Sequence, residues 1–361
     1  MREKRIIISG GGTAGHIHPA IAVSQKLKER EPDSVFVFVG TTRALEQRIM
    51  AHYKAKFIPL RIEGIKGKGI KMIKSLFLLP FSLLKSLAIL IRIKPQLVIG
   101  VGGYSSGPIV LLASRLKIPT LIMEQNLRPG LTNRLLRRWV EKAVVSFPQS
   151  LPYFGEKGIF IGNPVREEFY TLVPKQRNNM LTLLLFGGSQ GSHFLNTCMM
   201  KTLPLLKKEK EHIQIFHQTG KKDLDWVREN YAQQGFEKAI VASYFEDIAS
   251  YFQKSDLIIS RAGASTIAEL IASQKASVLI PFSQAADDHQ VLNARELERV
   301  SGAEVITEHE FSPESFSQKI LGFLENKEKI DRMEKNLVPL KTDKVADRIA
   351  DLCIELMGKG C

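Results

Sequence analysis

Short apolar runs alternate along this chain with longer segments in which apolar side chains recur at helical spacing. The runs have the length of buried strands. In the first half they lie at residues 5–9, 35–39, 97–100, 120–123 and 158–161. In the second half they lie at residues 181–186, 213–218, 239–243, 257–259 and 277–280. This alternation predicts an α/β protein with parallel sheets covered by helices.

Each half of the chain opens on the same three-part pattern. A predicted strand is followed at once by a glycine-rich turn, Gly10 to Gly15 in the first half and Gly187 to Gly191 in the second. Helical spacing then begins, at residues 17–30 and 192–206. The repeat predicts two doubly wound, Rossmann-like domains that face one another.

The chain is long enough for two such domains, because 361 residues exceed the size of one ordinary domain. We expect an N-terminal domain at residues 1–165 and a C-terminal domain at residues 166–343. The polar segment 173–179 has the composition of a linker region. Apolar positions at helical spacing predict a last helix within residues 344–361, which we expect to pack back on the N-terminal domain.

The first glycine turn matches the dinucleotide-binding fingerprint, because Gly10, Gly12 and Gly15 have its spacing. That fingerprint requires an acid after the second strand, where this chain has Gly40-Thr41-Thr42-Arg43 instead. We therefore favour a turn that brings backbone close to another ligand. His16 follows the turn, and a neutral imidazole there can take a proton from a hydroxyl group. A histidine that only caps or packs is the alternative.

A second candidate site follows the apolar run 257–259, where a small-residue turn leads into a helix predicted at residues 267–273. The N–H groups and the dipole of such a helix start favour a phosphate or diphosphate. Glu269 lies one turn into this helix and can accept hydrogen bonds from two sugar hydroxyls. The stretch from Thr266 to Glu269 is also a capping box, in which Glu269 only satisfies the helix start. Both interpretations stay open at this point.

The strand at residues 120–123 delivers Glu124 and Asn126 at its carboxyl end. Ligands of open parallel sheets bind at that end, so both side chains are candidates for chemistry or recognition. Asn126 is also a common turn former. His16 and Glu124 are therefore both candidates for a general base.

The chain carries a formal net charge of +14, which suits nucleic acid, an anionic membrane surface or a polyphosphate ligand. The charge is uneven, because Glu63 is the single acid among the basic residues between 61 and 94. A helix is predicted at residues 70–93, with one apolar face for the sheet and a second left for a partner. Its longest uncharged run, residues 75–84, is far shorter than the roughly 20 residues that span a bilayer.

Basic flanks beside an apolar face are typical of a surface that lies on a membrane without crossing it. An ordinary buried helix pair is the alternative. The membrane-facing residues expected from this pattern are Lys71, Lys74, Leu76, Phe77, Leu79, Phe81, Leu84 and Lys85. We expect no nucleic-acid partner, because the basic residues alternate with leucine and isoleucine and no row of stacking aromatic residues accompanies them.

The cysteines Cys198, Cys353 and Cys361 are widely separated and lack metal-ligand spacing. This favours a reducing compartment and argues against disulfides or a zinc site. Asp223-Leu224-Asp225 resembles the Asp-x-Asp pair that binds a metal in some nucleotide-sugar enzymes. It lies near a helix start, where the dipole favours aspartate, so we interpret it as structural. We expect neither a metal nor a cofactor.

Seven motifs, in order across both halves, resemble those of one enzyme family, the N-acetylglucosaminyltransferases of peptidoglycan synthesis. They are Gly11-Gly12-Thr13-Ala14-Gly15-His16, Gly102-Gly103-Tyr104-x-Ser106-Gly107-Pro108, Glu124-Gln125-Asn126, Gly162-Asn163-Pro164-Val165-Arg166, Gly187-Gly188-Ser189-Gln190-Gly191, residues 261–269 and Gln290-x-x-Asn293-Ala294. The resemblance implies the two-domain GT-B glycosyltransferase architecture. It also implies inverting transfer of GlcNAc from UDP-GlcNAc to the 4-hydroxyl of MurNAc in undecaprenyl-diphosphoryl-MurNAc-pentapeptide, which converts lipid I to lipid II without a metal in the active site.

The resemblance further implies roles for single residues. Glu269 would hold the ribose, the turn from Ala264 to Thr266 would meet the diphosphate, and backbone at Phe245 would read the uracil. The base would be His16, which we prefer to Glu124 because the ordinary pKa of histidine lies near neutral pH. The family's donor contacts carry over onto Thr13, Ala14, Gly15, Asn126, Arg166, Ser189, Phe245, Ala264, Ser265, Thr266, Ile267, Ala268, Glu269 and Gln290. In the family, position 14 is usually glycine and position 245 is commonly a smaller aliphatic residue.

A protein of this family would be peripheral, on the cytoplasmic face of the cell membrane, and would serve cell wall biogenesis, cell shape and cell division. Its expected partners are UDP-GlcNAc as donor substrate, lipid I, an anionic membrane surface and other cell-wall synthesis proteins. A related GT-B enzyme that glycosylates diacylglycerol would share the fold, the membrane patch and much of the donor site. That enzyme is the main alternative.

Overall fold

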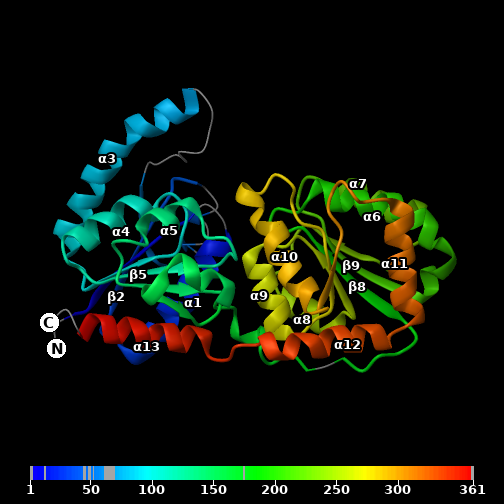
Figure 1. Ribbon diagram of the computed structural model, residues 1–361. Coiled ribbons are helices and arrows are strands. Elements are labelled where there is room, and N and C mark those ends of the chain that lie inside the picture. The colour runs from blue at the N-terminus through cyan, green and yellow to red at the C-terminus, as the bar shows by residue number, and fades with distance from the viewer. Residues whose placement is uncertain are drawn as a thin grey trace. The chain divides into compact units, whose positions relative to one another are not determined.

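The computed structural model describes residues 3–11, 14–43, 46–47, 50–51, 53–60, 70–173 and 175–358, with the backbone alone at residues 14, 70–79 and 286. The chain divides into two units (Figure 1). The first unit comprises Met1–Val165 and Lys344–Cys361, and the second comprises Arg166–Asp343. These bounds coincide with those expected from the sequence.

The first unit is built on a seven-stranded parallel sheet with the order β3-β2-β1-β4-β5-β6-β7, which is the doubly wound arrangement. Its strands are β1 (Arg5–Ser9), β2 (Val35–Gly40), β3 (Lys56–Pro59), β4 (Leu97–Gly100), β5 (Thr120–Glu124), β6 (Lys142–Val145) and β7 (Gly158–Phe160). Its helices are α1 (Ala14–Arg30), α3 (Ile70–Ile93), α4 (Ser106–Arg115), α5 (Leu131–Leu136) and α13 (Val345–Gly358), with short 3-10 helices η1 (Pro148–Tyr153) and η2 (Gly155–Lys157).

Helices cover both faces of this sheet because successive side chains of β1 point in opposite directions. Ile6 and Ile8 pack with α1 and α13, whereas Ile7 packs with α3, α4 and α5. All three isoleucines are buried, as expected for a central strand of a parallel sheet. In Figure 1, α13 and α4 accordingly lie on opposite sides of the sheet.

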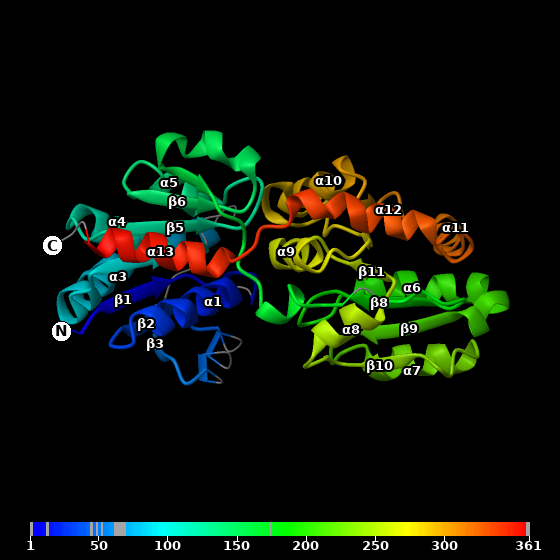
Figure 2. The ribbon, with the colours of Figure 1, turned by 90° about the horizontal axis from the view of Figure 1, so that it is seen from below.

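The last helix, α13, belongs to the first unit although it follows the second unit in sequence. It packs beside α1, and Val345, Ile349 and Cys353 are buried in the same core as that helix (Figure 2). Arg30 at the end of α1 forms ion pairs with Asp347 at 3.0 Å and with Asp351. The C-terminal helix is thus held by an apolar face and by paired charges.

The second unit contains a six-stranded parallel sheet with the order β10-β9-β8-β11-β12-β13. Its strands are β8 (Leu181–Phe186), β9 (Ile213–Gln218), β10 (Ile240–Ala242), β11 (Leu257–Ser260), β12 (Ser277–Leu279) and β13 (Ala303–Val305). Its helices are α6 (His193–Leu206), α7 (Leu224–Gln233), α8 (Ile248–Lys254), α9 (Ala264–Ser273), α10 (His289–Arg299), α11 (Pro313–Glu325) and α12 (Glu328–Leu337). Short 3-10 helices are η3 (Glu167–Phe169), η4 (Lys207–His212), η5 (Ala286–Asp288) and η6 (Val338–Leu340).

The segment 173–179, which the sequence predicts to be a linker region, is anchored on the second unit where the structure describes it. The buried carboxylate of Asp256 accepts hydrogen bonds from Lys175 Nζ at 2.7 Å and from the Thr182 amide at 2.8 Å. Arg177 donates to Glu334 of α12 at 2.7 Å. A buried carboxylate requires such partners. The linker prediction is therefore wrong for this stretch, because charge pairing with residues far along the chain fixes it.

Strands are predicted more accurately than helix starts. β1, β4, β8 and β9 have the predicted bounds. In β4 and β8 the nearly continuous apolar run is typical of a buried parallel strand. The helices α1 and α9 each begin about one turn earlier than predicted, at Ala14 and Ala264. Their first turns are made of small residues that the sequence assigns to the preceding turns.

Candidate active-site residues of the two units

The glycine turn of the first unit packs backbone against backbone. Gly11 follows β1 and donates to the Gly102 carbonyl oxygen at 3.4 Å. Gly103 has a φ of +78°, and a Cβ added to it would lie 2.5 Å from the Gly11 carbonyl oxygen. Only glycine suits a left-handed residue in so close an approach. Of the donor contacts expected in this turn, Thr13 lies outside the described residues, whereas Ala14 and Gly15 form the start of α1.

His16 lies in the first turn of α1 and is partly buried. Its imidazole packs on Gly102, because a Cβ added to that glycine would lie 2.9 Å from His16 Cδ2 and 3.0 Å from His16 Nε2. The ring is therefore held at the carboxyl ends of β1 and β4, where doubly wound sheets bind their ligands. Packing on a glycine and access to a substrate hydroxyl are compatible, since the residue is only partly buried.

Glu124, the last residue of β5, is 3% exposed and accepts four hydrogen bonds. Its oxygens receive Asn126 N at 3.0 Å and Asn126 Nδ2 at 3.3 Å, Gly130 N at 3.0 Å, and Asn133 Nδ2 at 2.8 Å. Burial raises the pKa of Glu124, and these hydrogen bonds oppose that shift. The carboxylate thus closes the loop between β5 and α5, and its lone pairs are engaged there.

The amino end of α9 in the second unit has the features of an anion site. Gly263 precedes the helix and offers no side chain for capping, and the first helical residues, Ala264, Ser265 and Thr266, carry no acid. The hydrogen-bond ladder of the helix begins at Ile267, which donates to the Gly263 carbonyl oxygen at 2.9 Å. The N–H groups of the first turn precede that ladder. Thr266 is therefore inside the helix, and the capping-box interpretation of Glu269 is wrong.

Glu269 lies in the second turn of α9 and is partly buried. Burial raises the pKa of Glu269 to about 7, while the charge of Arg166 lowers it and that of Glu168 raises it. Arg166 in turn pairs with Glu168 at 3.0 Å and stacks over the Phe169 ring at 5.0 Å. Two of the expected donor contacts, Arg166 and Glu269, are thus close enough to interact electrostatically.

The other expected donor contacts follow strands of the same unit. Ser189 is exposed in the glycine turn after β8, and Phe245 is buried after β10, stacked on Tyr251 with ring centroids 3.9 Å apart. Gln290 in α10 accepts from the Phe282 amide at 3.0 Å. Ile267 is turned into the core, whereas Ala268 beside it is partly buried. Asn126, in the first unit, is partly buried beside Glu124.

Sequence reasoning missed two polar residues that lie against the glycine turns. Glu46, which is 1% exposed, accepts from the Thr41 amide at 2.6 Å and from Thr41 Oγ1 at 2.5 Å, and its carboxylate lies against Gly11. Gln218, which is 2% exposed, contacts the turn after β8. Gln218 ends a predicted strand, and that position could have identified it. Glu46 carries no such signal.

The exposed face of α3 agrees with the membrane-facing pattern where side chains are described. Phe81 and Leu84 are 70% and 65% exposed, whereas Ile89 and Leu90 are buried against the sheet. Lys85 is exposed and donates to the Pro59 carbonyl oxygen at 2.7 Å. The side chains of Lys71, Lys74, Leu76, Phe77 and Leu79 lie outside the description. From residue 80 onward, one face of α3 is therefore buried and the other is exposed.

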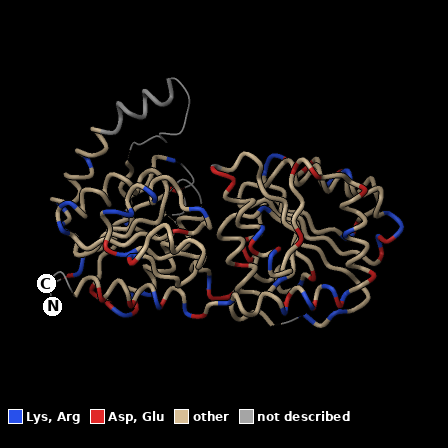
Figure 3. The backbone as a smooth tube through the Cα atoms, in the orientation of Figure 1, with Lys and Arg blue, Asp and Glu red and all other residues tan. Residues whose placement is uncertain are grey.

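Two further observations concern the distribution of charged residues and the hydropathy of the helices. Lysine and arginine occur on both units, interspersed with aspartate and glutamate (Figure 3). Among the residues that the structure describes, no helix is long and apolar enough to cross a membrane.

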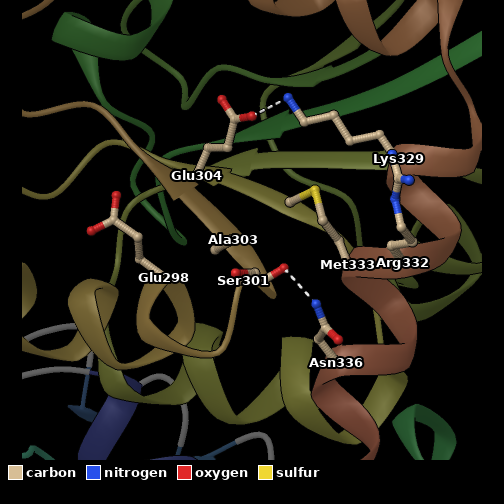
Figure 4. A pocket seen from close by; sticks show the side chains of 8 residues that line it. All are labelled: Glu298, Ser301, Ala303, Glu304, Lys329, Arg332, Met333 and Asn336. Atoms are coloured by element: carbon tan, nitrogen blue, oxygen red, sulfur yellow. Dashed lines mark hydrogen bonds and ion pairs between the residues drawn. The ribbon is translucent and has the colours of Figure 1, made fainter.

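Asp223 and one pocket lie outside these glycine turns, and their neighbours indicate a structural role. Asp223 accepts from Asn196 Nδ2 at 2.7 Å and lies 2.9 Å from His193 Nδ1, and the described residues contain no cluster with metal-ligand geometry. A pocket between α10, β13 and α12, lined mainly by charged and polar residues, contains an ion pair between Glu304 and Lys329 (Figure 4). That pocket lies beside the start of β13, whereas the expected donor contacts follow strand ends.

Comparison with known proteins identifies both halves of the chain. Residues 6–145 match the glycosyltransferase family 28 N-terminal domain, and residues 182–351 match the glycosyltransferase family 28 C-terminal domain. The UDP-N-acetylglucosamine–N-acetylmuramyl-(pentapeptide) pyrophosphoryl-undecaprenol N-acetylglucosamine transferase of Myxococcus xanthus is 39% identical over 357 residues, which cover 98% of this chain and 93% of the relative. The enzyme of the same name from Desulfotalea psychrophila is 39% identical over 363 residues, covering 99% and 98%.

A solved structure supports the same grouping. The crystal structure of MurG from Acinetobacter baumannii matches with a TM-score of 0.80 at 27% identity, covering 98% of this chain and 99% of that one. Together with the two family 28 domains and the two parallel sheets, this match confirms the GT-B architecture expected from the sequence.

Proposed function

This chain belongs to glycosyltransferase family 28 and is an N-acetylglucosaminyltransferase of peptidoglycan synthesis, and we propose that its two units divide the reaction between them. The reaction moves GlcNAc from UDP-GlcNAc to the 4-hydroxyl of MurNAc in undecaprenyl-diphosphoryl-MurNAc-pentapeptide, so that lipid I becomes lipid II. In this proposal the second unit holds the donor, and the first unit supplies the base for the acceptor hydroxyl.

The amino end of α9 is the observation that carries the donor assignment. Its first turn has small residues, no acid and N–H groups that precede the helical ladder. A diphosphate placed there accepts hydrogen bonds from those N–H groups and is stabilised by the helix dipole. The same groups stabilise the additional negative charge on UDP as it leaves, which is work that a metal ion performs in other enzymes.

In this proposal Glu269, one turn further along α9, accepts hydrogen bonds from the two ribose hydroxyls. A carboxylate is an efficient acceptor for two neighbouring donors. Arg166, whose charge acts on Glu269, favours the ionised form that makes these bonds. The assignment fits a nucleotide whose diphosphate lies at the start of the helix and whose ribose lies one turn away.

His16 is the base in this proposal. The oxygen of the MurNAc 4-hydroxyl attacks the anomeric carbon of GlcNAc from the face opposite UDP, and the bond from that carbon to the diphosphate oxygen breaks. His16 takes the hydroxyl proton as the new glycosidic bond forms, and UDP leaves with the electron pair. Inversion at the anomeric carbon follows from the single displacement.

Glu124 has a different role in this proposal. Its carboxylate already accepts four hydrogen bonds that close the loop carrying Asn126. Protonation by a substrate would weaken those bonds and loosen the loop. We therefore assign Glu124 to positioning Asn126, which leaves proton transfer to His16.

We further propose that the protein binds peripherally to the cytoplasmic face of the cell membrane through α3. The acceptor sugar is tethered by a diphosphate to a polyprenyl chain, so the first unit has to reach the bilayer surface. Phe81 and Leu84 supply exposed apolar area, and the lysines of α3 supply charge for anionic headgroups. Other cell-wall synthesis proteins are candidate partners at the same surface.

A donor and acceptor screen tests the proposed function. UDP-GlcNAc, UDP-glucose and UDP-galactose are each incubated with a lipid I analogue and, separately, with diacylglycerol, and the glycosylated products are measured by mass spectrometry. We expect GlcNAc transfer to the lipid I analogue alone. Transfer to diacylglycerol without transfer to the lipid I analogue would establish the glycolipid alternative instead.

A further inference from the structure

Gln218 joins two backbone segments of the second unit through one buried side-chain amide. It is the last residue of β9 and pairs in register with Phe186 of β8 and Ala242 of β10. Its Nε2 donates to the Gly188 carbonyl oxygen at 2.9 Å, and its Oε1 accepts from the Phe245 amide at 2.8 Å. The side chain therefore spans from the turn after β8 to the segment after β10.

Both segments carry expected donor contacts. The turn held through Gly188 contains Ser189, and the segment held on the other side contains Phe245, whose backbone is expected to read the uracil. Because the Phe245 N–H already donates to Gln218, its carbonyl oxygen is the backbone atom left to meet the base. That acceptor suits the N3–H donor of uracil, whereas cytosine presents a lone pair at the same ring position.

The surrounding backbone leaves little room for these segments to shift independently. A Cβ added to Gly191 would overlap the Thr219 carbonyl group, and one added to Gly220 would overlap the Gln190 carbonyl group. The turn after β8 therefore packs directly on the residues that follow Gln218. Tyr251 stacks on the Phe245 ring and supports the other segment.

We propose that Gln218 is a positioning residue for the nucleotide, which sets the spacing between the segment that reads the base and the glycine turn that carries Ser189. The proposal rests on the function given above. A glutamine amide can do this because it carries one donor and one acceptor at the same end. Glutamate retains the acceptor for Phe245 but sets a carboxylate oxygen against the Gly188 carbonyl oxygen, and methionine offers neither group.

The test compares Gln218→Glu and Gln218→Met with a matched control on the same strand. Gln214 also donates through Nε2 to a backbone carbonyl oxygen, that of Lys238 at 2.7 Å, but near the amino end of β9. Gln214→Glu therefore removes a similar hydrogen bond, at a position that is distant from the expected donor contacts along β9. The measurements are melting temperature, kcat and KM for UDP-GlcNAc, and affinities for UDP, CDP and inorganic diphosphate by calorimetry.

We expect both Gln218 variants to raise the KM for UDP-GlcNAc and to weaken UDP binding roughly tenfold, which is the scale of one lost buried hydrogen bond. Their kcat at saturating donor should change little, inorganic diphosphate should bind as before, and the preference for UDP over CDP should shrink. Gln214→Glu should leave all these affinities unchanged, even if it lowers the melting temperature.

Two results would overturn the proposal. One is UDP affinity in the folded Gln218 variants equal to that of the wild type or tighter, and the other is an equal loss for UDP and for inorganic diphosphate. The calorimetry does not depend on turnover. A wild-type chain that binds UDP but transfers no GlcNAc would therefore contradict the proposed function while still testing Gln218.

Discussion

The two glycine turns share a sequence pattern but pack against different neighbours. In the first unit, Gly11 approaches Gly103, which follows β4. In the second unit, Gly191 approaches Gly220, which follows β9. In the sheet orders, β4 and β9 lie on opposite sides of the first strand of their units. The same glycine turn can therefore have different neighbours. They depend on which adjacent strand leads into the glycine that packs against the turn.

The side chains beside the two turns also differ in charge. The first turn packs on the buried carboxylate of Glu46, and the second packs on the neutral amide of Gln218. A buried carboxylate repels a nearby phosphate, whereas an amide does not. The difference fits a first turn that presents His16 for proton transfer and a second turn that lies beside an anionic donor.

The largest expected effect is on kcat, and it distinguishes the role of the first unit from that of the second. Replacing His16 with alanine should lower kcat roughly 10²–10⁴-fold, because general base catalysis contributes on that scale. The KM for UDP-GlcNAc should change little, since the proposed donor site lies in the second unit. The control is Glu124→Gln, for which we expect a lower melting temperature and a smaller loss of kcat. Near-normal kcat in His16→Ala would transfer the role of base to Glu124.

The second prediction concerns the donor. Glu269→Ala should raise the KM for UDP-GlcNAc roughly a hundredfold or more, the scale for losing two hydrogen bonds to a charged acceptor. The melting temperature should stay close to that of the wild type, because Glu269 is not a capping residue. Glu298→Ala, a change at a partly buried glutamate of α10 that pairs with Arg295, is the control and should leave KM unchanged. An unchanged KM in Glu269→Ala would remove the ribose assignment.

The third prediction tests whether the membrane surface belongs to the first unit. Replacing Lys71, Lys74 and Lys85 with glutamate should weaken binding to anionic liposomes about a hundredfold, since each lysine contributes on the order of 1 kcal/mol. Reaction with a short-chain soluble acceptor should survive. The same charge change at exposed Lys207, Lys208 and Lys221 of the second unit is the control and should have little effect. Sedimentation of the first variant with liposomes at low salt would place the membrane face elsewhere.

We expect a smaller effect of pH on the KM for UDP-GlcNAc, and its direction follows from the pKa of Glu269. Burial raises the pKa of Glu269 to about 7, so the carboxylate is mostly protonated at pH 6 and mostly ionised at pH 8. The ionised form accepts from both ribose hydroxyls more strongly than the protonated form, which itself carries an O–H donor. The KM for UDP-GlcNAc should therefore fall roughly tenfold as pH rises from 6 to 8, then level off. In Glu269→Gln the dependence should disappear, and an equal slope in that variant would assign it to another group.

The smallest expected effect is that of chelation. EDTA should leave the rate of GlcNAc transfer unchanged, because the amino end of α9 can meet the diphosphate with N–H groups. The assay uses extensively dialysed protein, with magnesium or manganese added back in parallel. If EDTA abolished the activity and either metal restored it, a metal would be part of the reaction. Asp223 and Asp225 would then be the candidate ligands.

The sequence by itself determined the features that depend on local patterns. Buried strands such as β4 and β8 are nearly continuous apolar runs. The two faces of α3 follow from helical spacing, so that Phe81 is exposed and Leu90 is buried. The glycine turns were visible because few residue types tolerate such close backbone approach. These signals lie within one turn or one strand, and the motifs that resemble the family lie on them.

Only the tertiary structure decided which side chains meet across distant parts of the chain. Glu124 is engaged because Gly130 and Asn133 fold back on it, and Gln218 is buried between Gly188 and Phe245. The early start of α9 likewise placed Glu269 beyond the reach of a cap. Hydrogen bonds and burial between segments that lie far apart in sequence leave no periodic trace along the chain, so the order of the strands has to be known before these partners can be named.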